Sequence, residues 1–140
     1  MHDTFPFLVD GVLYTSVYQC MMCYQMLKVD DVESFRELRK LESAVLLKER
    51  AARLSRRYPR KWDKHAYESC LAAVRAKFNG PCKHTLMKEG EIAYISPDLF
   101  WGTGGSEAAA LIGLPYRGRN VYGEILTTVR EELLDKEYQD

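Results

Sequence analysis

The sequence has no excess of charge of either sign, which removes one simple route to a partner. Its 140 residues include 20 basic and 20 acidic side chains, so the formal net charge at pH 7 is +0. A balanced chain has no global attraction to nucleic acid or to membrane surfaces. No apolar run approaches the ~20 residues that a membrane-spanning helix needs. The first residues also lack a basic region followed by an apolar stretch, so we expect no signal peptide.

Cysteine is scarce as well, with four residues, two of them in Cys20-Met-Met-Cys23. This is not the pattern of a disulfide-dense secreted domain, and we expect a reduced, cytoplasmic location. The spacing suits zinc, but further ligands would have to come from Cys70, Cys82 and His84, which include no second closely spaced pair. Two buried, unreactive thiols are the alternative interpretation. We expect neither a metal nor a cofactor.

The charges that are present are unevenly distributed. The C-terminal end is acidic, from Glu131 to Asp140. A basic segment with little acid between its members comprises Arg50, Arg53, Arg56, Arg57, Arg60, Lys61 and Lys64. Two interpretations stay open: solvated helix faces, or a local site for the phosphates of a nucleotide or of nucleic acid.

The N-terminal residues predict a hairpin followed by a helix. Phe7 to Tyr14 has two short apolar runs around Asp10-Gly11, a pair that allows the positive φ angles of a type I′ turn. Thr15 or Ser16 then caps a helix that ends near Lys28. Its apolar residues recur at three- and four-residue steps, which predicts a core-facing stripe.

Two further helical stretches are predicted before the first glycine-proline stop. The first runs from Val32 to Arg57, weakens at Leu41-Glu-Ser43 and ends before Pro59. The second runs from Trp62 to Phe78, with Tyr67, Leu71, Val74 and Phe78 expected on one buried face.

The C-terminal part predicts a short helical turn, a strand, a long loop and a last helix. These cover Pro81 to Met87, Glu91 to Ile95, Phe100 to Arg119, and Asn120 to Glu137, respectively. A hydrophobic content of 46% is enough for one core. We therefore expect an α+β fold, a mostly helical single domain over residues 1–140 with a short hairpin and few short strands.

The loop begins with Asp98-Leu-Phe-Trp101-Gly102, which joins an acidic residue, a Trp and a flexible glycine. A carboxylate beside an aromatic wall suits a ribose. It can bond hydroxyls, or stabilise positive charge on the anomeric carbon while a glycosidic bond breaks. The alternative is that Asp98 caps a turn and Trp101 belongs to the core.

Gly118-Arg119-Asn120 precedes the last helix and is a candidate anion site. Free N–H groups, the positive helix end and a guanidinium would coincide there. The alternative is a plain glycine loop with Asn120 as the helix N-cap. Gly102-Thr-Gly104-Gly105 resembles a phosphate-binding loop in composition alone, because no Lys-Ser/Thr follows.

In their order and spacing, these segments resemble the NADAR family, named for its proposed link to NAD and ADP-ribose. The resemblance rests on Leu8-Val-Asp-Gly11, Trp62, Ala72 to Phe78, Asp98 to Gly102, Gly118 to Asn120, and Val129-Arg-Glu131. Members include N-glycosidases that act on phosphoribosyl intermediates of riboflavin synthesis, and enzymes that remove ADP-ribose from guanine bases.

The resemblance implies roles for individual residues. Asp98 would act at the anomeric centre, with Tyr18 at the position of the family's catalytic Glu. Trp62 and Trp101 would wall the base or ribose. Phosphates and ribose would be held by Arg56, Arg57, Gly102, Gly118, Arg119 and Asn120.

The departures from the family pattern concern catalysis. The Glu that is taken as catalytic is replaced by Tyr18, and a Lys later in the same helix is replaced by Gln25. A phenol with a pKa of ~10 is a poor base at neutral pH. A Gly-Arg element reads Leu54-Ser-Arg56-Arg57, without the glycine, and an insert from Ala108 to Tyr116 lengthens the loop.

These features lead to two main hypotheses. The first is an N-glycosidase that acts on an ADP-ribose or phosphoribosyl N-glycosidic linkage, with ADP-ribosylated guanine among its expected partners. The second is a non-catalytic binder of an ADP-ribose-type or cyclic nucleotide. A third is an interaction protein on a retained scaffold. We also expect no membrane partner and a possible homo-oligomer through the 106–116 insert.

Overall fold

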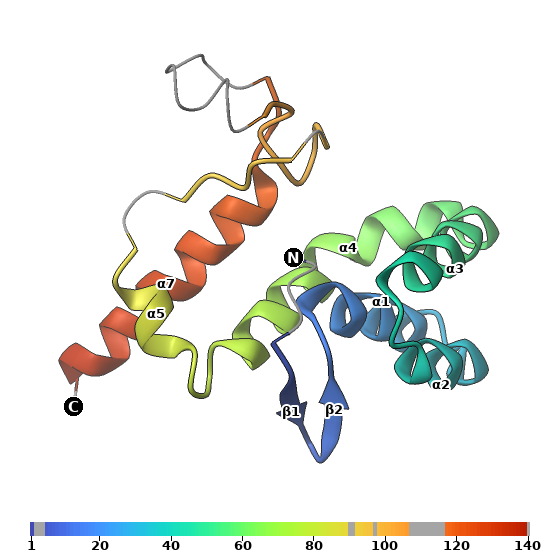
Figure 1. Cartoon of the computed structure of the whole chain (residues 1–140), viewed down its shortest axis with the longest axis horizontal. Helices are drawn as coiled ribbons and strands as arrows, with labels where there is room; N and C mark the ends of the chain where they lie inside the picture. Colours follow the sequence, from blue (N-terminus) through green and yellow to red (C-terminus); the bar gives the residue numbers. More distant parts are fainter. Residues whose placement is uncertain (2–4, 90–91, 97, 107–116, 140) are drawn as a thin grey trace. The chain divides into compact units, whose positions relative to one another are not determined.

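The protein forms two compact units, which a computed structural model describes for residues 1, 5–89, 92–96, 98–106 and 117–139. The first unit is Met1–Gly80 and the second is Pro81–Asp140 (Figure 1). The fold is α+β and mostly helical, with one two-stranded sheet in the described residues, as the sequence predicts. Throughout this described part, every helix is too short or too polar to traverse a bilayer.

The first unit begins with an antiparallel hairpin of β1 (Phe7–Val9) and β2 (Val12–Tyr14). Asp10 and Gly11 both have positive φ, 50° and 79°, as the predicted type I′ turn requires. The rings of Phe7 and Tyr14 are cross-strand partners, with centroids 6.1 Å apart. The hairpin and its turn are therefore confirmed.

Helix α1 (Val17–Lys28) follows, with the Ser16 side chain accepting a hydrogen bond from the Gln19 N–H. This helix packs against α4 and α2 and is buried on most of its circumference (Figure 1). Its buried residues are Val17, Gln19, Cys20, Met21, Met22, Cys23, Gln25 and Met26. Two of the buried residues carry amides, so both amides must find hydrogen-bond partners inside the unit.

The predicted break near Leu41–Ser43, in the helical stretch that begins at Val32, is confirmed. Helix α2 (Val32–Lys40) and helix α3 (Ala44–Arg57) are separated at Leu41–Ser43. The Gln19 Nε2 donates to the carbonyls of Leu38, Arg39 and Leu41, at 3.1, 3.2 and 2.9 Å. The last carbonyls of a helix have no partner within the helix. The buried Gln19 amide supplies one from α1.

Helix α4 (Pro59–Lys77) differs from the prediction in its start and in its buried face. It begins at Pro59, which occupies the first turn, where a missing N–H has no cost. Tyr67 is 43% exposed, so the predicted face is wrong at that position. The face that is buried consists of Trp62, Ser69, Cys70, Ala73 and Val74. Small and polar residues there obscured the phase of the apolar stripe.

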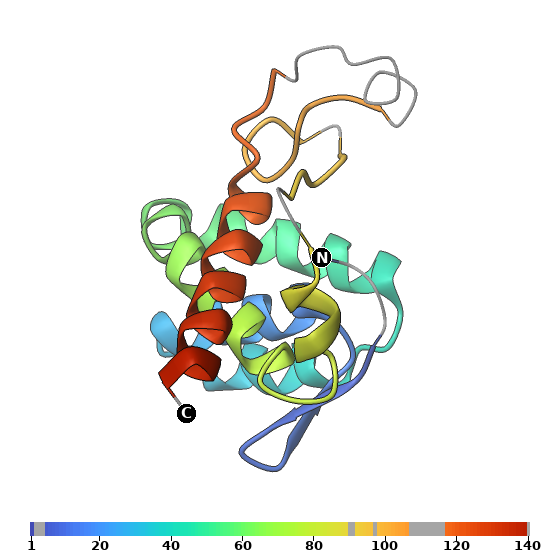
Figure 2. The same cartoon turned by 90° about the vertical axis from the view of Figure 1, so that its left-hand side faces the viewer.

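The second unit has two described helices, α5 (Lys83–Met87) and α7 (Val121–Gln139), which lie side by side (Figure 2). The predicted strand is wrong over Ile92–Ile95, and Glu91 lies outside the described residues. This segment does not join a ladder. Its backbone groups bond to the Asn120 side chain and to the Thr103 N–H instead.

Candidate functional site

Asp98 closes a tight turn at the start of the candidate loop. Its Oδ1 accepts hydrogen bonds from the N–H groups of Phe100 and Trp101, at 2.8 and 2.7 Å. The Gly102 N–H donates to the Asp98 carbonyl at 3.1 Å. The capping interpretation therefore holds for Oδ1. The side chain is exposed, and no hydrogen bond to Oδ2 is found among the described residues.

The residues after Asp98 are joined to the segment before α7 by backbone hydrogen bonds. Five successive N–H groups, from Gly118 to Tyr122, donate to carbonyls between Leu99 and Thr103, at 2.8 to 3.0 Å. The two segments are therefore held together around the start of α7 (Figure 2).

This pairing corrects the expected anion site at Gly118-Arg119-Asn120. The N–H groups of these residues are already bound to carbonyls, so they are not free to bind an anion. The Arg119 side chain is exposed and can still provide a cation. A phosphate at this position would therefore bind to the Arg119 guanidinium and not to the N–H groups at the start of α7.

Two glycines permit close approaches of the backbone within this loop: Gly102 to the residues before Asp98, and Gly118 to the residues after it. A Cβ on Gly102 would lie 2.6 Å from the Ser96 Cβ, and a Cβ on Gly118 would lie 2.7 Å from the Thr103 carbonyl carbon. Real Cβ atoms do not come this close, so a side chain on Gly102 would displace Ser96, and a side chain on Gly118 would displace Thr103. Both glycines thus shape the loop by their lack of a side chain.

Asn120 is the central side chain of the loop. It has a positive φ of 52° and is 6% exposed. Its Oδ1 accepts from the Tyr94 N–H at 2.7 Å, and its Nδ2 donates to the Ile92 carbonyl at 2.9 Å. Asn120 therefore does not cap α7 with its side chain. It holds the Ile92–Tyr94 segment against the helix start.

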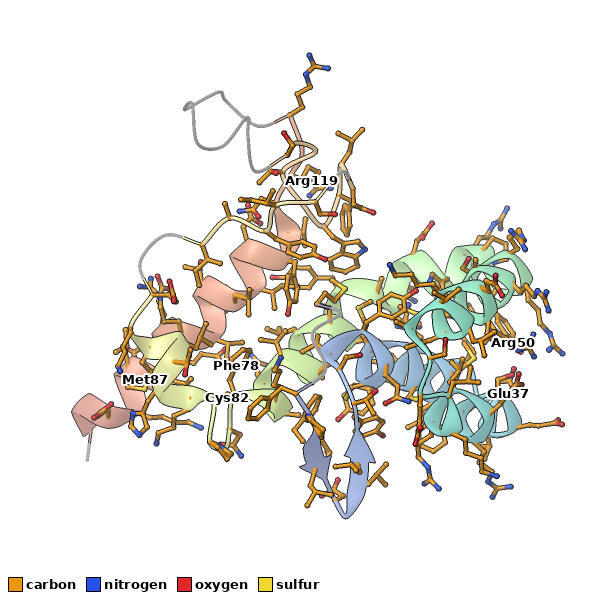
Figure 3. All side chains as sticks on the ribbon, viewed as in Figure 1. Glu37, Arg50, Phe78, Cys82, Met87 and Arg119 are labelled. Carbon is orange, nitrogen blue, oxygen red and sulfur yellow. The ribbon has the colours of Figure 1, made fainter. Side chains whose placement is uncertain are left out.

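An aromatic pair lies next to Asp98. The rings of Phe100 and Trp101 meet edge to face with centroids 4.8 Å apart, and the Arg119 guanidinium lies 5.1 Å from the Phe100 centroid. Figure 3 labels Arg119 on this loop. Arg119 and Trp101 are thus linked through Phe100, a residue that was not among the predicted site residues. Its place inside the Asp-x-x-Trp segment was the signal that could have indicated it.

The remaining candidate residues belong to the first unit. Tyr18 lies on α1, and burial raises the pKa of its phenol above the usual 10.0. Arg56 and Arg57 are exposed at the end of α3, and the Arg57 guanidinium lies 5.6 Å from the Tyr58 ring centroid. Trp62 is buried in α4. Because the pKa is raised, less of the Tyr18 phenol is ionised at neutral pH than in an ordinary tyrosine, so less phenolate is present to act as a base.

Gln25 stands where the family pattern has Lys, and both polar atoms of its amide form hydrogen bonds. It is 1% exposed. Its Nε2 donates to the Trp62 carbonyl at 2.8 Å, and its Oε1 accepts from the Ser69 hydroxyl at 2.8 Å. The amide therefore joins α1 to α4. A lysine ammonium could make the first of these bonds but not the second, because it cannot accept.

Cys20 and Cys23 are buried, as the unreactive-thiol interpretation expects, and Cys70 is buried as well. Burial raises the pKa of Cys20, Cys23 and Cys70 to about 12 each. Cys82 is half-buried. Within the described ranges, no three Cys, His, Asp or Glu side chains come together as a metal would require. Burial keeps these three thiols protonated at neutral pH, which makes them poor nucleophiles.

The hairpin, the helix after it and the Asp98 loop are the features on which the resemblance to the NADAR family rests. A model of the NADAR family, described as the NADAR domain, matches residues 2–134, so the chain belongs to this family. Relatives add to this picture. The chain is 36% identical over 120 residues to the riboflavin biosynthesis protein VVA0006 of Vibrio vulnificus (strain YJ016). That alignment covers 79% of the chain but only 29% of the length of the relative.

The fold also matches a solved structure. The NMR structure of the E. coli protein YbiA superposes with a TM-score of 0.72 over 98% of the chain and 77% of YbiA. The sequence identity is 20%, so this likeness concerns the fold alone.

Proposed function

We propose that the protein is an N-glycosidase that hydrolyses the N-glycosidic bond of an ADP-ribose or phosphoribosyl compound, with Asp98 as the reacting carboxylate. Membership of the NADAR family supports the substrate class, since a nucleotide-like ligand is expected of it. The similarity to a riboflavin biosynthesis protein supports an N-linked phosphoribosyl compound. That a single domain spans residues 1–140 also stays a prediction.

The observation that carries the proposal is the geometry of Asp98. Its Oδ1 is held by two N–H groups, so the carboxylate has a fixed orientation. The side chain is exposed, which leaves Oδ2 accessible. Positive charge develops on the anomeric carbon as the C–N bond breaks, and a fixed carboxylate stabilises it without reorganisation.

Neighbouring residues have supporting roles in this proposal. Trp101 offers an aromatic face for the base or the ribose. Arg119 offers a guanidinium for phosphate oxygens, and its contact with Phe100 orients it. Gly102, Gly118 and Asn120 maintain the loop that carries them. Ligand roles for Trp62, Arg56 and Arg57, which belong to the first unit, stay expectations of the family resemblance.

Two observations favour a second candidate, a binder that does not turn its ligand over. The pKa of Tyr18 is raised by burial, so the family's catalytic position carries no base at neutral pH. Gln25 is engaged in packing α1 against α4. On this proposal, Asp98 and Arg119 recognise the nucleotide and the bond stays intact.

One experiment separates the two candidates. The protein is incubated with ADP-ribosylated guanosine, with NAD and with a ribosylamino-pyrimidine phosphate, and both binding and product are followed by calorimetry and chromatography. We expect released base and ribose phosphate product from at least one compound. Tight binding with every compound recovered intact would favour the binder. Absence of binding to all three would contradict both.

A further inference from the structure

Basic side chains gather where α3 meets α4. The stretch from Arg50 to Lys64 has seven lysines and arginines and a single acid, Asp63, although the chain as a whole is balanced. Figure 1 shows the end of α3 leading into the start of α4. This stretch is therefore far more basic than the chain as a whole, and we call its exposed side chains the α3–α4 basic surface.

On α3 this surface lies opposite the core. Arg53, Arg56 and Arg57 are exposed, and Arg56 and Arg57 follow Arg53 by three and four residues, so they lie one turn along the helix from it. The residues that α3 buries are Leu47, Ala51 and Leu54. The three guanidinium groups thus face outward together.

On α4 the surface continues through the first two turns. Arg60, Lys61 and Lys64 are exposed, while the buried face of the helix begins with Trp62. Arg60 and Lys61 lie in the first turn, which contains no acidic residue. Cations are unfavourable at the positive end of a helix. Helix stability therefore does not account for them.

Few of these cations are neutralised within the protein. Arg50 forms an ion pair with Glu37 at 2.7 Å, labelled in Figure 3. Among the described residues, no ion pair involves Arg53, Arg60 or Lys64. Exposed like charges on adjacent turns repel one another, so a polyanion that binds them relieves this repulsion.

We propose that the α3–α4 basic surface binds the phosphate backbone of a single nucleic-acid strand. Arginine is suited to phosphate because its planar guanidinium donates two parallel hydrogen bonds. Tyr67 is 43% exposed and stands three residues after Lys64 on the same side of α4. An exposed aromatic ring beside a basic track can stack on a base.

A mononucleotide and a membrane are less suitable partners for this surface. A mononucleotide is too small to engage a set of cations that extends over two helices. A membrane-binding helix needs apolar residues beside the basic ones. The large exposed apolar residues of α3 are Val45 and Leu46, at the opposite end of that helix from Arg56. The proposal goes beyond the proposed hydrolysis, which assigns no role to Arg53, Arg60, Lys61 or Lys64.

Binding is measured by fluorescence anisotropy of a labelled oligodeoxythymidine strand across a salt series. The test variant is Arg53→Glu/Arg60→Glu. The control is Arg36→Glu/Lys83→Glu, which makes the same charge change at exposed sites outside the surface. We expect wild type and control to bind alike and the test variant to lose at least about tenfold in affinity.

The salt dependence and a neutral variant make the result specific. Log K falls as log salt rises, and each lost phosphate contact makes this slope shallower by about 0.7. The slope for the Arg53→Gln/Arg60→Gln variant should therefore be shallower by about 1.4. Tyr67→Ala should weaken binding but leave the slope unchanged. Circular dichroism checks that each variant is folded.

Three results would overturn the proposal. One is no binding of the strand by wild type at low salt. Another is an equal loss for test and control variants. The third is binding to phosphatidylserine vesicles, but not to the strand, with the same dependence on Arg53 and Arg60. A separate assay of hydrolysis on a free nucleotide keeps this outcome independent of the proposed function.

Discussion

Gly123 leaves open the space that the Asn120 side chain occupies. A Cβ on Gly123 would overlap the Asn120 Oδ1 and the Ile92 carbonyl oxygen, and would lie 2.5 Å from the Asn120 Nδ2. The amide bonds to Ile92 and Tyr94 in this space. The glycine and the asparagine are therefore two parts of one arrangement, which holds the segment before Asp98 against α7.

Gly123→Ala should destabilise the protein because the added methyl group displaces the Asn120 amide. The Tyr94 N–H and the Ile92 carbonyl would then lose their partners, at a cost of about 1–3 kcal/mol for each such group that stays buried. Urea unfolding followed by circular dichroism measures this loss. Gly80→Ala is the matched control, since nothing lies within 4 Å of a Cβ there. Equal stability of the two variants would contradict the account of Asn120.

Gln25→Lys should also destabilise the protein, although it introduces the residue of the family pattern. The ammonium cannot accept from the Ser69 hydroxyl, and its charge would be buried between α1 and α4. We expect a loss of at least about 1–3 kcal/mol in the free energy of unfolding. Leu27→Lys, on the exposed side of α1, is the control and should change little. An unchanged stability of Gln25→Lys would show that this amide is dispensable.

Stability should fall as the pH rises above about 9. The thiols of Cys20, Cys23 and Cys70 have pKa values raised from 9.0 to about 12 by burial. The unfolded chain therefore releases these protons first, and the stabilisation present below pH 9 is lost progressively toward pH 12. Urea unfolding at pH 7.5 and pH 10 tests the sign. Equal stability at the two pH values would contradict this prediction.

Local chemistry predicted the elements whose signals are contiguous in the sequence. The Asp10-Gly11 turn needs two positive φ angles, and Ser16, one of the two predicted caps of α1, bonds to an N–H only three residues away. The phase of α4 was missed because Ser69 and Cys70 are buried where an apolar stripe was sought.

Contacts between distant segments account for the errors in the candidate loop. Asn120 bonds to residues 26 and 28 positions earlier, which no local pattern reveals. The same long-range pairing occupies the N–H groups of Gly118 and Arg119 and leaves Ile92–Ile95 without a strand partner in the described chain. The predicted 106–116 oligomer surface lies outside the described residues except for Ser106.

Truncation of Asp98 should affect the loop in a way that amide substitution does not. Asp98→Ala removes the acceptor for the Phe100 and Trp101 N–H groups. Because these groups are near the surface, we expect a loss of only about 1 kcal/mol, as for a lost helix cap. Asp98→Asn keeps a carbonyl oxygen at this position and should retain the wild-type thermal midpoint.

The most direct test of the proposed function is product formation by Asp98→Asn, because this variant removes the charge and keeps the turn. Single-turnover release of guanine or another base is compared with wild type, with Asp135→Asn as an exposed control on α7. We predict a rate at least about 100-fold lower for Asp98→Asn, with ligand affinity within a few-fold of wild type and no change for Asp135→Asn. Product formation at the wild-type rate by Asp98→Asn would contradict the role of this carboxylate in the reaction.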